Sequence, residues 1–229
     1  SVIPLDGVLP DSSLVSVNSS LRNTFSFNKT SPVFGIDYMY SNNKNRILLV
    51  NGIDTRNTIL HDIRLRWNLG RMITFVNDFQ PGIRTYHSEY FSNKNYEIDL
   101  LSNETRLSYQ PKNTLRTSII YSYGSKKNSL ATEVCEDHNL AAEVKFNIVR
   151  KASLQFRIDY IRIQYNSDMN TPVAYVMLEG FNPGNNASWL LMVQRSISDN
   201  LQLSLNYNGR ISEGTQAVHT GGVQIRALF

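Results

Sequence analysis

The stretch VQIRALF, from Val223 to Phe229, carries the pattern that decides the fold. Val223, Ile225, Ala227 and Phe229 occupy alternate positions, and a glutamine and an arginine stand between the first three of them. Successive side chains of a β-strand point to opposite faces, so this segment is predicted to be a strand with one apolar and one largely polar face. A strand of a soluble sandwich and a strand of a transmembrane barrel have the same pattern, and the rest of the chain must decide between these two folds.

The same alternation recurs along the chain. In residues 201–211, LQLSLNYNGRI, three leucines and a tyrosine alternate with glutamine, serine and asparagine. Several segments run for about 10 to 15 residues, longer than the usual five or six of soluble strands, and this length suits a tilted membrane crossing. We predict eleven strands, at residues 14–28, 33–43, 58–69, 71–86, 96–109, 114–124, 139–149, 152–166, 187–197, 201–212 and 219–229.

Short and long connections alternate between these segments. Short polar turns recur roughly every 40 residues, and longer connections are predicted at residues 42–57, 88–95, 124–139, 166–186 and 212–219. This is the layout of a membrane barrel with short periplasmic turns and longer outer loops. A propeller is excluded because its four short strands per blade leave no room for such long runs. At Ile161 the apolar positions change parity, which predicts a β-bulge.

The fold class predicted is therefore all-β, a transmembrane antiparallel up-and-down β-barrel over residues 14–229, with residues 1–13 as an N-terminal lead-in or linker. No run of roughly 18 apolar residues is present, which excludes a helical membrane span. Bacterial single-chain barrels have an even number of strands, so we expect about 12 in the closed barrel. Either residues 47–53 conceal a further crossing, or the chain is the C-terminal part of a larger barrel or larger protein.

The end of the chain resembles a known signal. Val223, Ile225, Ala227 and Phe229 match the β-signal of outer-membrane barrels, in which apolar residues at every second position lead to a terminal Phe. This resemblance implies a Gram-negative outer-membrane location, insertion by the barrel-assembly machinery, and surroundings of lipid and lipopolysaccharide. More loosely, residues 182–221 resemble the C-terminal barrel ends of large Bacteroidota outer-membrane proteins, which implies a larger parent but no reaction.

Charged residues of the polar parity are predicted to point into the barrel. They are mostly basic, in a chain of net charge +4. In a wide pore they would favour anions, whereas in a narrow barrel they would pair with the acids and fill the lumen. We favour the filled lumen for about 12 strands. The predicted lumen charges are Arg64, Arg66, Arg106, Arg116, Glu143, Lys145, Arg157, Asp159, Arg162, Arg210 and Arg226; an interfacial girdle is predicted from Tyr86, Tyr90, Phe91, Tyr96, Tyr121 and Tyr123.

Residues for chemistry are few. The segments Glu136-Asp137-His138 and His87-Ser88-Glu89 bring carboxylate, imidazole and hydroxyl groups to predicted outer loops, where a rim hydrolase would need them. Their spacing defines no nucleophile and base, so we interpret them as solvated loop residues and expect no enzymatic activity. The single Cys135 allows no internal disulfide, and no Cys or His pair has metal-ligand spacing, so no metal or cofactor is expected.

Three functions of different classes follow. The leading one is a structural or assembly role, in which the barrel anchors or forms part of a larger outer-membrane complex with other outer-membrane or periplasmic proteins. It is favoured because long constriction loops are not evident. The alternative is an anion-leaning channel or porin-like transporter, and the third is the rim hydrolase. Nucleic acid is not an expected partner, because the Lys and Arg residues are scattered rather than clustered.

Overall fold

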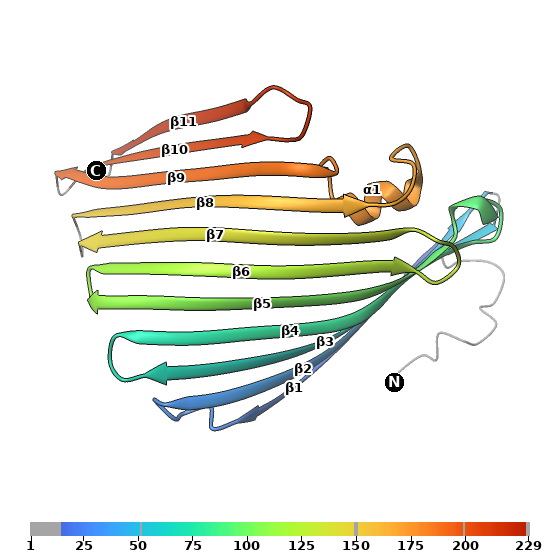
Figure 1. Cartoon of the computed structure of the whole chain (residues 1–229), viewed down its shortest axis with the longest axis horizontal. Coiled ribbons are helices and arrows are strands. Elements are labelled where there is room, and N and C mark those ends of the chain that lie inside the picture. Colours follow the sequence, from blue (N-terminus) through green and yellow to red (C-terminus); the bar gives the residue numbers. More distant parts are fainter. Residues whose placement is uncertain (1–14, 51, 149–150, 199, 228–229) are drawn as a thin grey trace.

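The chain forms one antiparallel sheet whose strands follow one another in sequence order (Figure 1). The computed structural model describes residues 15–50, 52–148, 151–198 and 200–227. Within them lie eleven strands, which confirms the predicted all-β up-and-down arrangement. They are β1 (Ser16–Phe27), β2 (Phe34–Leu49), β3 (Gly52–Leu69), β4 (Ile73–Ser88), β5 (Tyr96–Lys112), β6 (Leu115–Asn128), β7 (Val134–Ile148), β8 (Ala152–Tyr165), β9 (Gly184–Ser198), β10 (Leu201–Ile211) and β11 (Val218–Ala227), with a 3-10 turn η1 (Ser92–Lys94) and one helix α1 (Pro172–Leu178).

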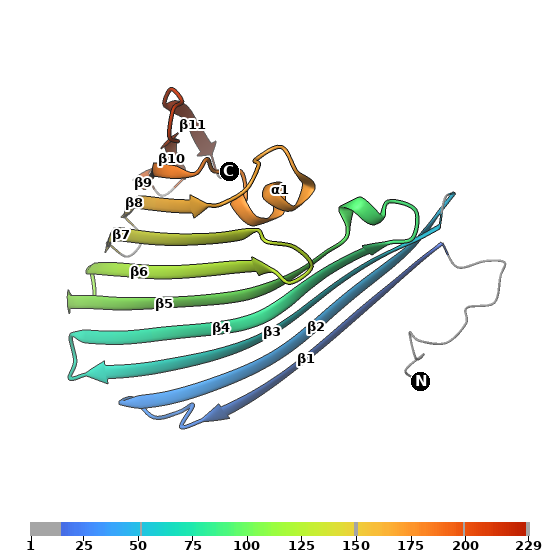
Figure 2. The ribbon, with the colours of Figure 1, turned by 45° about the vertical axis from the view of Figure 1, so that its right-hand side comes forward.

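The sheet is curved, and its two outermost strands are β1 and β11. Figure 2 shows β9–β11 turning out of the plane of the middle strands. Over the described residues, β1 pairs with β2 and β11 with β10, and the two outermost strands are not paired with each other. The closed barrel of about 12 strands therefore stays a prediction. The predicted lead-in at residues 1–13 and the terminal Phe229 lie outside the described residues.

Two hairpins, β2–β3 and β6–β7, are longer than predicted. The pairing of β2 with β3 continues from Phe34↔Trp67 to Leu49↔Gly52, so the long connection predicted at residues 42–57 is wrong, and residues 47–53 contain no additional crossing. Likewise β6 and β7 remain paired as far as Lys127↔Val134, well inside the predicted connection 124–139. Alternation disappears where both faces of a sheet contact water, but the backbone hydrogen bonds do not need it.

The bulge predicted at Ile161 is absent. The strand β8 pairs with β7 and with β9 without any register shift. The apolar residues change parity there because Ile163, which faces inward, packs against α1 on that face of the sheet. A register shift occurs instead between Leu201 and Gln202, where β10 begins beside β9.

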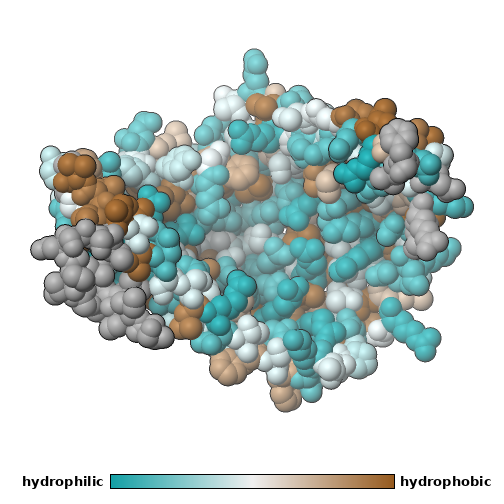
Figure 3. Space-filling view, turned by 180° about the vertical axis from the view of Figure 1, so that it is seen from behind, coloured by the Kyte–Doolittle hydropathy of each residue, from teal (hydrophilic) through white to brown (hydrophobic). Residues whose placement is uncertain are grey.

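The two faces of the sheet differ in polarity, as the alternation predicts. We call the face that carries Glu143 and Asp159 the inner face, and the face that carries Phe156 and Ile158 the outer face. The inner face is crowded and polar, with both of its named acids buried, whereas Phe156 and Ile158 are exposed. Figure 3, seen from behind the view of Figure 1, shows a hollow whose visible centre is mostly hydrophilic.

A glycine and a tryptophan fit together on the outer face of β9 and β10. Trp189 lies opposite Gly209 in the register, and a Cβ added to Gly209 would overlap the indole ring. The indole ring therefore lies over the backbone of Gly209, and any side chain at this position would displace the ring. On the neighbouring strand β11, a Cβ at Gly222 would meet no atom within 4 Å.

Replacing Gly209 by alanine should destabilise the sheet, whereas the same change at Gly222 should not. The overlap with Trp189 forces the ring out of its position, and overpacking of this kind costs about 1–3 kcal/mol. Urea unfolding of Gly209→Ala and Gly222→Ala in lipid vesicles measures the difference. Equal free energies of unfolding for the two variants would contradict the packing described here.

Candidate functional site: the polar inner face

The predicted lumen charges fall on one face, with one exception. By the strand register, ten of them lie on the inner face: Arg64, Arg66, Arg106, Arg116, Glu143, Lys145, Arg157, Asp159, Arg210 and Arg226. Arg162 lies on the outer face, on the same side of β8 as Ile158 and Tyr160. Its predicted inward orientation depended on the bulge, and without the bulge it is wrong.

Glu143 is the centre of a charge network on the inner face. Its side chain is only 5% exposed, although it is a carboxylate. Lys145 Nζ lies 3.1 Å from its Oε1, Arg106 Nη1 lies 3.8 Å from its Oε2, and Gln155 Nε2 donates a hydrogen bond of 2.8 Å. These partners come from β5, β7 and β8, so one buried acid connects side chains from three strands. A buried charge needs such partners to offset its lost hydration.

Further ion pairs lie along the same face. Arg157 donates hydrogen bonds from Nε and Nη2 to the carboxylate of Asp159, at 2.7–3.1 Å. Arg64 Nε lies 3.5 Å from Asp78 Oδ1. Arg106 also contacts Glu104, at 3.0 Å. Each of these pairs joins residues of one strand or of neighbouring strands and so lies along the wall, and the filled lumen stays a prediction.

Bases outnumber acids on the inner face. Several of these residues were missed by sequence reasoning, although their parity was a usable signal. By register, the described inner-face bases are Arg22, Arg56, Arg64, Arg66, Arg84, Arg106, Arg116, Lys126, Lys145, Arg157, Arg210 and Arg226, and the acids are Asp37, Asp54, Asp62, Asp78, Glu104, Asp137, Glu143 and Asp159.

A cavity of about 530 Å³ lies in the hollow beside β7–β11. Its inner-face lining includes the polar residues Lys145, Gln155, Gln194, Asn206 and Gln224 and the apolar Met192. The lining as a whole also includes apolar groups such as Leu154, Val193 and Leu205, so the cavity presents both polar and apolar surface.

Three tyrosine–histidine pairs lie on the outer face. The Tyr hydroxyl is 2.8 Å from His Nδ1 in each pair, and the two residues come from neighbouring strands. The pairs are Tyr38–His61, Tyr121–His138 and Tyr207–His219. Tyrosine and histidine each combine an apolar ring with a polar group, which is the chemistry of an interfacial girdle.

The aromatic residues predicted to form an interfacial girdle lie on both faces of the sheet, and the girdle itself stays a prediction. Tyr121 and Tyr123 lie on the outer face of β6, as expected. Tyr86 and Tyr96 instead face inward, where their rings stack 5.7 Å apart and Tyr86 donates a 2.7 Å hydrogen bond to Asp54. The sequence did not separate them because aromatic residues occur on both faces near the long connections.

The outer face changes character beyond the girdle. On β2 the side chains that follow Tyr40 on this face are Asn42, Lys44 and Arg46, and then Leu48 near the end of the strand. Below Tyr40, towards the short turns, the same face of β2 carries Tyr38, Ile36 and Phe34. On β2, therefore, Tyr40 lies where a run of apolar side chains gives way to a mostly polar one.

The structure does not assemble the residues considered for a rim hydrolase. His138 and Asp137 are consecutive in β7, so their side chains lie on opposite faces. The same holds for His87 and Ser88 in β4, where His87 is hydrogen-bonded to Asn95 at 3.2 Å. Among the described residues, no group of three His, Cys, Asp or Glu could hold a metal ion. The expected lack of enzymatic activity stays a prediction.

Comparisons with known proteins give fold matches only. No family model matches the chain, and no curated protein matches it by sequence. Among solved structures it is similar to the NanC porin (12% identity, TM-score 0.44, 92% of this chain and 99% of that one). It is also similar to LpxR from Salmonella typhimurium (7% identity, TM-score 0.36, 92% of this chain and 88% of that one). A third similar structure is the translocator domain of the autotransporter NalP from Neisseria meningitidis (11% identity, TM-score 0.36, 93% of this chain and 80% of that one).

At these identities and TM-scores none of the three assigns a function to this chain. Within the described residues, no helix has the length and hydropathy needed to cross a membrane.

Removing the buried acid should destabilise the wall. In Glu143→Ala the cations Arg106 and Lys145 lose their common partner, which should cost about 1–3 kcal/mol. Glu104→Ala removes a more exposed acid that contacts the same arginine, and its cost should be smaller. Urea unfolding of both variants in vesicles provides the comparison. A larger loss for Glu104→Ala would show that Glu143 does not organise the network.

Proposed function

We propose that the sheet is the wall of an outer-membrane barrel and that its inner face lines an aqueous passage favouring small anions. The observation that carries this proposal is the opposite chemistry of the two faces of one wall. Apolar side chains point outward along the strands, and charged side chains point into the hollow.

The outer face suits lipid better than water. A monomeric soluble protein rarely exposes a contiguous apolar patch of more than a few hundred Å². Each strand from β2 to β10 also pairs with a neighbour on both sides, which supports a wall whose backbone finds its hydrogen bonds within the sheet, as a bilayer requires. The exposed apolar side chains of the outer face include Phe25, Ile63, Trp67, Leu107, Ile119, Leu140, Phe156, Ile158, Val223 and Ile225.

The inner cations are accessible as well as numerous. The Arg64 side chain is 56% exposed and that of Lys145 is 44% exposed, although both contact acids. Accessible positive charge along a path raises the local concentration of anions and lowers that of cations. The excess of bases therefore supports a preference for anions over cations.

The first measurement combines electrophoresis and conductance on one refolded sample. A difference in electrophoretic mobility between the unboiled and the boiled sample would indicate a folded barrel. Stable steps of current across a planar bilayer would indicate the passage. In a salt gradient the reversal potential should have the sign of an anion-selective pore. The absence of steps in any salt, both from the folded protein and from a folded variant that lacks α1, would overturn the passage.

Charge reversal on the two faces should separate lining residues from lipid-facing ones. Arg64→Glu places an acid on the inner face, so the reversal potential should move toward cation selectivity. Arg162→Glu makes the same change on the outer face and should leave selectivity unaltered, which makes it the matched control. An equal shift in both variants would contradict the assignment of the faces.

A second candidate function is the structural or assembly role, in which the chain forms part of a larger complex. The unpaired edges of β1 and β11 favour it. Neighbouring strands are antiparallel throughout, so β1 and β11 run in the same direction, and one strand running the opposite way would pair antiparallel with both. Exposed edges are templates for pairing with another chain. Contact with barrel-assembly machinery, lipopolysaccharide and other envelope proteins stays a prediction, as does Bacteroidota origin.

Photo-crosslinking from the edges tests the assembly role. A photoreactive residue in place of Asn23 on β1 or Gly221 on β11 should capture another protein in cells. The same residue in place of Ile119, on the outer face of the mid-sheet strand β6, should capture only lipid. Crosslinks that join β1 to β11 within one chain would show that the barrel closes on itself and would contradict this role.

A further inference from the structure

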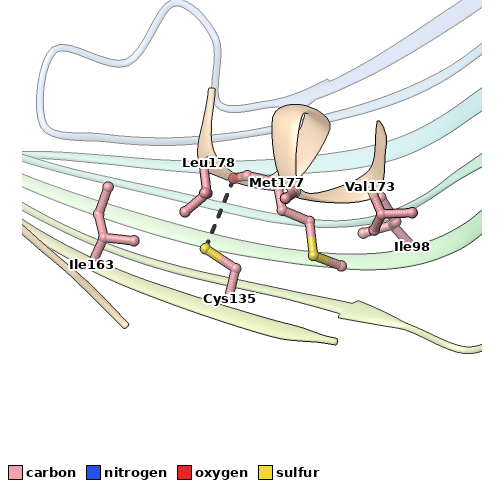
Figure 4. Packing of buried hydrophobic residues seen from close by; sticks show 7 residues of the cluster. Ile98, Cys135, Ile163, Val173, Met177 and Leu178 are labelled. Carbon is pink, nitrogen blue, oxygen red and sulfur yellow. Dashed lines mark hydrogen bonds between the residues drawn. The ribbon is translucent and has the colours of Figure 1, made fainter. Parts of the chain in front are cut away.

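The helix α1 lies against the inner face, inside the curve of the sheet. It belongs to the connection between β8 and β9 and packs on Ile98 of β5, Cys135 of β7 and Ile163 of β8, all three of which face inward (Figure 4). On the helix side, Ala174 is 0% and Met177 1% exposed. This is the best-buried apolar cluster of the described chain, and it lies on an otherwise polar face.

The helix is also held at both ends by polar contacts. At its start, the Thr171 hydroxyl accepts a 3.0 Å hydrogen bond from the Ala174 amide, and Pro172 follows the cap. At its end, Lys126 of β6 donates hydrogen bonds to the Met177 carbonyl at 2.8 Å and to the Glu179 carboxylate at 2.7 Å. The contacts to β5, β6, β7 and β8 fix the helix to the wall, in contrast to a freely moving loop.

One large side chain of α1 points away from the wall. With about 3.6 residues per turn, Val173, Ala174, Met177 and Leu178 share one side of the helix. Tyr175 lies on the other side and is 78% exposed. Its ring therefore projects from the wall into the space that the curved sheet partly surrounds.

We propose that α1 is a fixed constriction of the passage and that Tyr175 sets its width. This inference rests on the passage proposed above and names the element that limits the size of the anions. The sequence showed no evident long constriction loop, and constriction elements were therefore not expected. The helix α1 nevertheless lies in one of the longest predicted connections, residues 166–186. A helix attached by a buried apolar cluster keeps its position without a bound ligand.

Two substitutions at Tyr175 test the width. Tyr175→Ala should raise single-channel conductance and admit larger sugars in liposome swelling, and Tyr175→Trp should do the opposite, by tens of per cent in conductance. The side chain is exposed, so neither change should impair folding, and the unboiled electrophoretic band verifies this. Tyr160→Ala removes an exposed tyrosine from the outer face of β8 and should change neither readout.

A third variant replaces residues 169–181 by a short Gly-Ser linker, and it covers the case in which the wild-type protein is closed. Conductance that appears or increases in this variant supports the constriction. If the wild-type protein conducts and all Tyr175 variants match it, the constriction is overturned while the passage stands. If neither the wild-type protein nor the folded linker variant conducts, the passage and the constriction both fail.

The native cysteine reports independently whether the helix is docked. Cys135 is 1% exposed beneath α1, with its Sγ 3.8 Å from the Met177 carbonyl oxygen. In the folded protein it should resist a membrane-impermeant maleimide, and Lys126→Met, which removes both contacts at the end of the helix, should speed the labelling. Rapid labelling of the folded wild-type protein would show that the helix is not fixed and would overturn the proposal.

Discussion

The requirement that every backbone N–H and C=O find a partner within the sheet governs this chain. Lipid offers no hydrogen bonds, so a wall that crosses it must pair strand with strand along its whole length. In the described residues the antiparallel order from β1 to β11 gives every strand between the two edges a partner on both sides, with local breaks such as the one at Pro81 between β3 and β4. Because the backbone groups are hydrogen-bonded within the sheet, the side chains decide what each face contacts. Every second residue of a strand points to the same face.

The inner face shows how one wall can combine two kinds of stabilisation. Along the middle of β5–β8 a buried acid and its cations hold neighbouring strands together, with Glu143 as the common partner. Near the long connections the same face becomes apolar and receives α1. The polar part remains hydrated, whereas the apolar part is covered by the chain itself. A side chain from the covered part, Cys135, is consequently isolated from solvent although it lies on a face that is otherwise wet.

Strand number and the two faces were predictable, because a sheet with one apolar and one polar face imposes period-2 alternation on the sequence. Strand ends were not, since the outer parts of β2 and β3 are polar on both faces and lose the alternation. Arg162 was misplaced for a related reason: Ile161 and Ile163 look like a shift of phase, although they face a helix. That helix had a signal of its own, Thr171 followed by Pro172, which is a favoured start of a helix.

In the proposed outer-membrane barrel, the length of the β2–β3 hairpin determines how much of the chain extends beyond the membrane. In the proposed barrel, with its short turns on the periplasmic side, the paired residues beyond Tyr40 and His61 extend past the apolar band as a two-stranded ribbon rather than an irregular loop. Because its two strands are paired, such a ribbon presents a defined set of side chains to an approaching molecule. For an antibody or a phage receptor-binding protein, this hairpin would be a well-ordered epitope, and changes in its polar residues would alter recognition without disturbing the wall below.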